Sequence, residues 1–192
     1  MDKLNARGFT LIELMVGVAV LAIALAAGVP SMSEFIQNSR LSAQANDLLA
    51  SLHLARTEAI KRNAQVTLCA KSPGAANCSI AAGTGWQIGW VVFVDVNNNR
   101  ALDAGEPVLD SHGAAANRVA ITPSIGNLNL FFYTSRGVVR YPDPADVTLS
   151  VALNGVFRIC DGRGLDHARG LVLSPTGRVE VTKSTTVIGT CP

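Results

Sequence analysis

Hydrophobic and polar positions divide the chain into three successive patterns. An apolar stretch, interrupted by one acidic residue, runs from Phe9 to Val29. A segment with apolar residues at every third or fourth position follows from Pro30 to about Asn63. The remainder, residues 64–192, consists of short apolar runs separated by glycine, proline and asparagine. Together the patterns predict a long helix followed by a β-rich domain.

The first two segments join into one predicted helix from Phe9 to about Asn63. At 1.5 Å per residue, such a helix is about 80 Å long. Pro30 is a position at which it can kink, and Lys61 and Arg62 suit the negative end of the helix dipole. We expect one apolar face to pack on a sheet, formed by Leu41, Ala45, Leu48, Leu52, Ala55 and Ala59 and widened by Leu49 and Ile60.

Runs typical of short strands follow this helix, each bounded by turn-forming residues. The predicted strands cover residues 65–70, 86–95, 118–122, 129–134, 136–141, 147–153, 156–160, 169–174 and 177–182. A long helix followed by many short strands favours the α+β class with an antiparallel sheet.

The apolar stretch is long enough to cross a membrane. Its 21 residues from Phe9 to Val29 match a hydrocarbon core of about 30 Å. Lys3 and Arg7 precede it, in agreement with the positive-inside rule, and no A-x-A cleavage site follows within reach. A simple membrane anchor leaves Glu13 unexplained, because an unpaired carboxylate in hydrocarbon costs several kcal/mol.

Composition narrows the classes of function. A net charge of +2 gives the chain no strong field toward nucleic acid or a membrane surface. The four cysteines, with an export signal, suggest two disulfides in an oxidising compartment. Three pairings are possible, and locality favours Cys69–Cys78 and Cys160–Cys191, the second of which would hold the C-terminal tail. No CxxC occurs and histidines are few, so we expect no zinc site.

No sequence pattern indicates catalysis. Asp161, His167 and Ser174 could be called a triad by residue type alone, because no nucleophile-elbow motif surrounds the serine. His53 lies on the predicted helix, and His112 lies in a predicted polar loop. Neither a phosphate-binding loop nor a dinucleotide fingerprint occurs. We therefore expect a protein without enzymatic activity.

The segment DVNNNRALDAGE, residues 95–106, partly matches a calcium-binding loop of the EF-hand type. Ligand positions 1, 3, 5, 9 and 12 are held by Asp95, Asn97, Asn99, Asp103 and Glu106. Ala101 would offer its carbonyl at position 7, but Arg100 stands at position 6, where the sharp turn needs glycine. The flanks VVFVDV and PVLDS are typical of strands rather than helices. The alternative is a polar turn, because asparagine and aspartate tolerate turn geometry.

Basic residues near the C-terminus are candidate contacts for DNA. They are Arg163, Arg169, Arg178 and Lys183. Affinity for DNA grows with the number of phosphates neutralised, so cations that converge on one surface could bind weakly. The alternative is an ordinary solvated strand and loop, in which Arg178 and Glu180 share one strand face and neutralise each other.

The N-terminal motif resembles the class III signal of type IV pilins and type II secretion pseudopilins. Lys3-x-x-x-Arg7-Gly8 is followed by Phe-Thr-Leu-Ile-Glu-Leu. The resemblance implies that prepilin peptidase cuts after Gly8 and that the new amine of Phe9 is methylated. It also implies that Glu13 pairs with the amine of a neighbouring subunit, which is far less costly than an isolated charge. Pro30 matches the proline of the family.

Three further stretches, LARTEAIKRNAQVTLC, GWQIGWVVFVD and GEPVL, resemble the GspH/FimT branch of minor pilins and pseudopilins. The resemblance implies a pilin-like fold with two β-sheets packed on the helix. The expected parts are a leader (1–8), a transmembrane and assembly helix (9–29), an amphipathic helix (30–63) and a globular domain (64–192). No cofactor is expected, apart from calcium if the loop binds it.

As a member of this branch, the chain is expected to be a minor type IV pilin near the filament tip that supports pilus assembly and twitching motility. Its partners would be other major and minor pilins, prepilin peptidase and the inner-membrane assembly platform. A single span of the inner membrane would hold the β-domain in the periplasm before filament assembly. The alternatives are a type II secretion pseudopilin and a DNA-binding subunit for natural transformation. FimT-type pilins implicated in DNA uptake carry Gly-Arg-x-Arg, but Gly177-Arg178-Val179-Glu180 retains only the first arginine.

Overall fold

The computed structural model of the protein describes residues 8–72, 85–116, 118–126, 128–143 and 149–191. It divides into two compact units, of which the first ends at Ser39 and the second begins at Arg40. A single helix, α1 (Leu11–Arg62), contributes to both units. The long helix predicted from the apolar pattern is therefore present, and the second compact unit begins within the predicted amphipathic segment 30–63.

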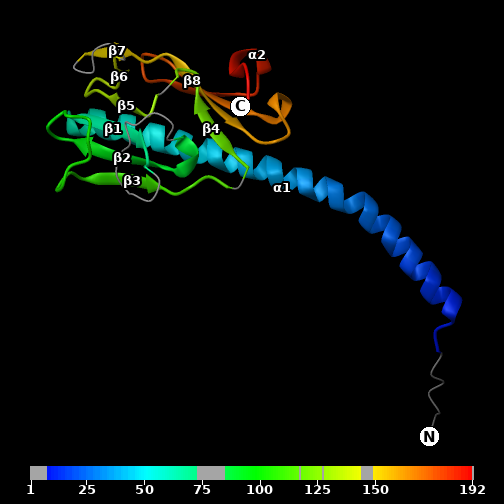
Figure 1. Cartoon of the computed structure of the whole chain (residues 1–192). Coiled ribbons are helices and arrows are strands. Elements are labelled where there is room, and N and C mark those ends of the chain that lie inside the picture. The colour runs from blue at the N-terminus through cyan, green and yellow to red at the C-terminus, as the bar shows by residue number, and fades with distance from the viewer. Residues whose placement is uncertain (1–7, 73–84, 117, 127, 144–148, 192) are drawn as a thin grey trace, which may run out of the picture. The chain divides into compact units, whose positions relative to one another are not determined.

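Short strands make up most of the second unit (Figure 1). In the described residues they are β1 (Gln65–Ala70), β2 (Trp90–Asp95), β3 (Val108–His112), β4 (Ala120–Pro123), β5 (Leu130–Tyr133), β6 (Val139–Pro142), β7 (Ser150–Ala152), β8 (Gly155–Cys160), β9 (Arg169–Leu173) and β10 (Val179–Thr182). Three short helices accompany them, namely η1 (Trp86–Ile88), η2 (Leu165–His167) and α2 (Thr185–Ile188).

The strands form two antiparallel sheets. The first has the order β3-β2-β1-β5-β6-β7, and the second has the order β10-β9-β8-β4. Every pairing between neighbouring strands is antiparallel. The predicted α+β class, with a long N-terminal helix and an antiparallel sheet domain, is confirmed.

The ends of most predicted strands are shifted by one or a few residues, and in two of them a nearby glycine explains the difference. Residues 86–95 divide into η1 and β2, because Gly89 between them has a φ of 119°. A Cβ atom at Gly89 would come within 2.4 Å of the His112 carbonyl oxygen, so this sharp turn requires glycine. The predicted strand 136–141 begins only at Val139, because Gly137 N–H donates to the Thr134 carbonyl at 2.8 Å and closes a turn.

The core joins α1 to both sheets. The predicted face of α1, Leu41 to Ala59, is at most 2% exposed, and Leu49 packs against its edge. Ile60 was expected to widen this face, but half of its surface is exposed because it lies at the solvent side of the last turn. Figure 1 shows this part of α1, in cyan, lying along the first sheet.

Successive residues along the central strands of the first sheet point to opposite faces and pack in two different buried clusters. One face of β1, β2 and β5 contacts α1 through residues such as Leu68, Val92 and Phe131. The opposite face forms a second buried cluster of Cys69, Val91, Phe93, Leu130 and Phe132, with Leu102 against it. Burial on both faces explains why these strands read as continuous apolar runs rather than alternating ones.

Aromatic side chains connect the two sheets. Trp86 lies against Phe157 of β8, with ring centroids 5.1 Å apart in an edge-to-face arrangement. Phe131 of β5 lies 5.5 Å from the Trp86 ring and 5.6 Å from the Phe157 ring. The Trp86 indole donates to the Leu128 carbonyl oxygen at 2.7 Å, so its buried N–H is satisfied. These contacts hold the two sheets as one core.

A disulfide fixes the C-terminal tail. Cys160 of β8 is bonded to Cys191, with the Cα atoms 5.8 Å apart, which confirms this predicted pair. The helix α2, which the sequence patterns did not predict, places Ile188 in a small cluster around the same bond. Closing a loop of this size contributes roughly 2–4 kcal/mol. Cys69 is also disulfide-bonded, while its predicted partner Cys78 lies outside the described residues.

Candidate functional site

The first turn of α1 is organised by Thr10 and Glu13. The Thr10 N–H and hydroxyl both donate to Glu13 Oε2, at 3.0 and 2.9 Å. In return, the Glu13 N–H donates to Thr10 Oγ1 at 3.3 Å. This reciprocal pair is a capping box, which satisfies two N–H groups that have no partner within the helix. The T-x-x-E spacing of Thr10 and Glu13 is the sequence signal that predicts such a cap.

The predicted cleavage position lies just before this cap. Gly8 and Phe9 precede the helix, and Phe9 is 88% exposed. No heavy atom lies within 4 Å of the position that a Cβ atom would take at Gly8. The peptide bond between them is therefore reachable by a peptidase, as exposed non-helical segments generally are. Pro30, the fourth residue singled out in the N-terminal segment, lies within α1.

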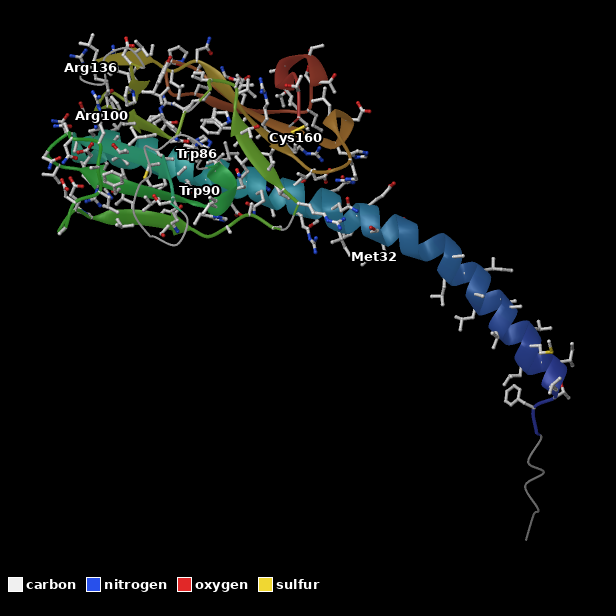
Figure 2. All side chains as sticks on the ribbon, in the orientation of Figure 1. Met32, Trp86, Trp90, Arg100, Arg136 and Cys160 are labelled. Atoms are coloured by element: carbon white, nitrogen blue, oxygen red, sulfur yellow. A yellow bond between two sulfur atoms is a disulfide. The ribbon has the colours of Figure 1, made fainter. Side chains whose placement is uncertain are left out.

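From Leu11 to Ala26, side chains that are nearly all apolar surround α1 (Figure 2). Every described residue from Phe9 to Ala26 is exposed within the chain, including the large side chains of Leu11, Ile12 and Leu14. A helix that is apolar all round needs lipid or other helices around it. Within the described part of the chain, α1 is the one helix whose length and composition allow it to cross a membrane.

A polar cluster attaches the second half of α1 to β2 and β3. The Ser51 hydroxyl donates to Asp110 Oδ2 at 2.5 Å and accepts the Trp90 indole N–H at 2.9 Å. His112 was expected in a polar loop but is the last residue of β3, because it pairs across from Trp90. Its ring stacks on Trp90 with centroids 4.1 Å apart, and Nε2 lies 3.2 Å from Asp47 Oδ2. The cluster is structural, since it fixes the helix to the sheet edge.

The residues of the nominal triad have other partners. The Asp161 carboxylate binds the guanidinium of Arg163, with Oδ2 2.7 Å from Nη2. Burial acts to raise the pKa of Asp161, but hydrogen bonds and charge from Arg163 outweigh it and lower the pKa below its usual value. The Ser174 hydroxyl lies 3.0 Å from Thr176 Oγ1, and His53 is exposed on α1. The partners of Asp161 and Ser174 are therefore groups outside the nominal triad.

The basic residues proposed for DNA lie at the two ends of β9 and β10. Arg163 and Arg169 lie in and beside the β8–β9 connection, and Lys183 follows β10 at the same end of the sheet. Arg178 lies in the β9–β10 turn at the opposite end of those strands. Its guanidinium pairs with Glu180 at 2.7 Å, as the neutralising alternative predicted.

Residues 95–106 connect β2 to β3. Side chains at the five candidate ligand positions are hydrogen-bonded to groups within this loop. No group of three or more His, Cys, Asp or Glu placed to hold a metal occurs among the described residues. Three of the six candidate calcium ligands in this loop are of other kinds, namely the side-chain oxygens of Asn97 and Asn99 and the backbone carbonyl of Ala101.

Two family models match this chain. The model described as type II transport protein GspH matches residues 44–177. The prokaryotic N-terminal methylation motif matches residues 3–29. The first covers most of the β-domain, and the second covers the apolar stretch with Gly8, Phe9 and Glu13.

Relatives and solved structures give a consistent picture. The pilin-like protein PilA1 of Thermus thermophilus is 32% identical over 152 residues, which cover 77% of this chain and 88% of that protein. The crystal structure of the type IV minor pilin FimU from Pseudomonas aeruginosa is similar with a TM-score of 0.53 at 19% identity, covering 79% of this chain and 94% of that one. A second crystal form of FimU gives a TM-score of 0.51 at 18% identity, with 76% and 94% covered.

Proposed function

The chain belongs to the type II transport protein GspH family, and from this premise we propose that it is a minor type IV pilin, anchored by α1 in the inner membrane and then built into a pilus. The observation that supports this most directly is the combination on one helix of a methylation motif and an apolar surface exposed on all sides. The role is structural, so we propose no enzymatic activity.

Processing is the first step of the proposed role. Prepilin peptidase would cut the exposed bond after Gly8, and the new amine of Phe9 would be methylated. The Thr10–Glu13 capping box does not involve residues before Phe9, so it can persist in the mature chain. Residues 9–29 would then begin a mature helix that is already capped at its N-terminus.

Assembly is the second step, and Glu13 supplies its specificity. Moving α1 from lipid into a filament exchanges one apolar environment for another, so hydrophobic burial alone provides little driving force. Both hydrogen bonds from Thr10 end on Glu13 Oε2. The carboxylate can therefore present Oε1 to the methylated amine of a neighbouring subunit. A charge pair in this low-dielectric environment is favoured over two separated charges.

The β-domain would meet partner pilins outside the membrane. Its two sheets and the second half of α1 share one core, so the domain would move as a unit when α1 leaves the bilayer. The proposed partners are other major and minor pilins and the inner-membrane assembly platform. We place the chain near the tip of the pilus, where it would support assembly and twitching motility.

A second candidate function is that of a minor pseudopilin in type II secretion, which the description of the matching family favours. The two roles share processing, anchoring and helix packing, and they differ in the machine that receives the subunit. DNA binding is not part of the proposal, because Arg178 pairs with Glu180 and lies at the opposite end of β9 from Arg163 and Arg169.

A deletion strain distinguishes these roles. We expect twitching to be lost, secretion of type II substrates to continue, and twitching to return when the wild-type chain is supplied from a plasmid. Transformation scored in the same strains reports any need for DNA uptake. Loss of secretion with normal twitching would contradict a role in the pilus and would instead support a role as a type II secretion pseudopilin.

A further inference from the structure

We propose that the loop of residues 95–106, between β2 and β3, binds one calcium ion. The ligands would be the side-chain oxygens of Asp95, Asn97, Asn99, Asp103 and Glu106 and the backbone carbonyl of Ala101. The proposal goes beyond assembly of the filament and does not depend on which machine receives the subunit.

A buried carboxylate with one unused oxygen lies at the base of this loop. Asp95 is only 1% exposed, and its Oδ1 is buried without a hydrogen-bond partner. Among the described residues, no ion pair involves Asp95. A buried carboxylate normally has a counter-charge or a full set of hydrogen bonds, because leaving water is costly for an anion. A bound cation would supply the counter-charge and would coordinate Oδ1 directly.

The Asp95 carboxylate is directed into the loop. Its Oδ2 accepts the backbone N–H of Arg100 at 2.9 Å, from across the loop, and also accepts from Gln65 and Thr67 at 2.7 and 3.2 Å. Because both oxygens belong to one carboxylate, Oδ1 lies beside this bond. Three donors hold the group in place and leave Oδ1 for a ligand inside the loop.

The other candidate side-chain ligands are linked to one another by hydrogen bonds around Asp103. The amide groups of Asn97 and Asn99 both donate to Asp103 Oδ2, at 2.8 and 2.6 Å. The Glu106 carboxylate reaches back across the opening and accepts the N–H groups of Val96 and Asp103, at 2.8 and 3.0 Å. Calcium would replace the amide hydrogens around Asp103, so the two asparagines would turn their oxygens inward and Glu106 would close on the ion.

Arg100, which departs from the glycine of an EF-hand loop, nevertheless adopts the backbone conformation that this position requires. Arg100 stands where an EF-hand loop has glycine, and its φ of 66° lies in the left-handed region that the sharp turn needs. Its guanidinium carbon lies 5.4 Å from the centre of the Phe132 ring, so the side chain packs on the sheet. Figure 2 labels Arg100 at the end of the domain where this loop lies. The arginine therefore weakens the site without abolishing its geometry.

Calcium fits these donors better than magnesium. Six oxygen positions that include a backbone carbonyl and a carboxylate able to bind through both oxygens suit the larger, more flexible coordination shell of calcium. Magnesium needs a tighter octahedron and keeps several waters. With three carboxylates and no glycine at position 6, we expect a dissociation constant on the order of 10⁻⁴–10⁻³ M, the range of weak extracellular sites.

Thermal unfolding of the full-length mature chain in detergent, stripped with EDTA, tests the proposal. We expect the unfolding temperature to rise as CaCl2 increases to millimolar levels and to change less with equal MgCl2. Asp103→Asn and Glu106→Gln should each lose most of the rise, since Asp103 is exposed and Glu106 only partly buried and neither change empties the core. Arg100→Gly should respond at a several-fold lower CaCl2 concentration.

Asp166→Asn is the matched control, because Asp166 is an exposed aspartate in η2, outside the loop. This variant should keep the full calcium response. No rise in either the wild type or Arg100→Gly would overturn the proposal. So would a rise of equal size in Asp103→Asn, or an equal rise with MgCl2.

Discussion

At the scale of single residues, the same side chain can serve the isolated chain and the assembly. Glu13 caps α1 through Thr10 in the chain before cleavage, and the same carboxylate is proposed to bind a neighbour's amine afterwards. The sequence motif pointed to the second role but not to the first. It identified the acid because a charge in an apolar run is conspicuous, whereas the cap becomes evident only when the helix start is placed at Thr10.

Glu13→Gln should distinguish the effect of the Glu13 charge on assembly from its effect on the helix cap. The amide oxygen can still accept from Thr10, but the neighbour's amine would lose its counter-charge, and an unpaired buried charge costs about 3–5 kcal/mol. We expect leader cleavage to continue and the amount of chain in sheared pili to fall at least about tenfold.

Thr10→Val is the control for that experiment, since it removes the two hydrogen bonds of the Thr10 hydroxyl from the cap and keeps the charge of Glu13. Immunoblots of sheared pili and whole cells measure both variants. A large loss from Thr10→Val with little loss from Glu13→Gln would assign the effect to the helix cap. An unchanged Glu13→Gln level would contradict the proposed ion pair.

Arg163 and Asp161 provide a prediction on stability and pH. Because the folded-state pKa of Asp161 is lowered, the interaction stabilises the fold above the unfolded-state pKa, about 3.9, and is lost as pH falls through the folded value. Arg163→Ala should therefore lower the free energy of unfolding by about 1–3 kcal/mol at pH 7, with a smaller effect in acid.

The control for this pair is Arg178→Ala, which breaks the exposed pair with Glu180. The two side chains of that pair are 74% and 56% exposed, so we expect a change of at most about 1 kcal/mol. Urea denaturation at pH 7 and below pH 4 compares the variants. An Arg163→Ala effect no larger than that of Arg178→Ala would show that burial adds nothing to the Asp161 interaction.

At the scale of elements, local patterns were predictable and non-local arrangement was not. The buried face of α1 followed from apolar spacing. β1 matches its predicted range because the five apolar or β-favouring residues from Val66 to Ala70 are bounded by Gln65 and Lys71. The division of residues 86–95 depends on contact between Gly89 and His112, which are far apart in sequence. The separation of Arg178 from Arg163 follows from strand order, which spacing along the chain does not report.

Leu48→Ala tests whether the second half of α1 is part of the domain core. Leu48 is fully buried between the helix and the sheets, so the truncation should cost about 2–5 kcal/mol. Ile60→Ala, on the same helix but half exposed, should cost much less. Urea denaturation of the mature chain measures both, and similar small losses would mean that the sheets do not need α1 for stability.

At the scale of the whole molecule, the chain combines an apolar helical segment with a packed domain. The side chains of residues 11–26 are exposed among the described residues, whereas the later part of α1 shares one buried core with the two sheets. The exposed apolar part of α1 gives a physical reason for assembly. The N-terminal motif would set its timing, because the amine that is proposed to pair with Glu13 would not exist before cleavage. Family membership was predictable from the sequence since the motif is contiguous. The geometry of the 95–106 loop was not, because it depends on a left-handed arginine and on the orientation of a buried carboxylate.

The most direct test of the central claim is the intact mass of this chain recovered from sheared pili. A minor pilin should appear in that fraction as a polypeptide that begins at Phe9 and carries one methyl group, with its cysteines oxidised. Recovery only from membranes, as a chain that retains residues 1–8, would contradict both the processing and the incorporation proposed for it.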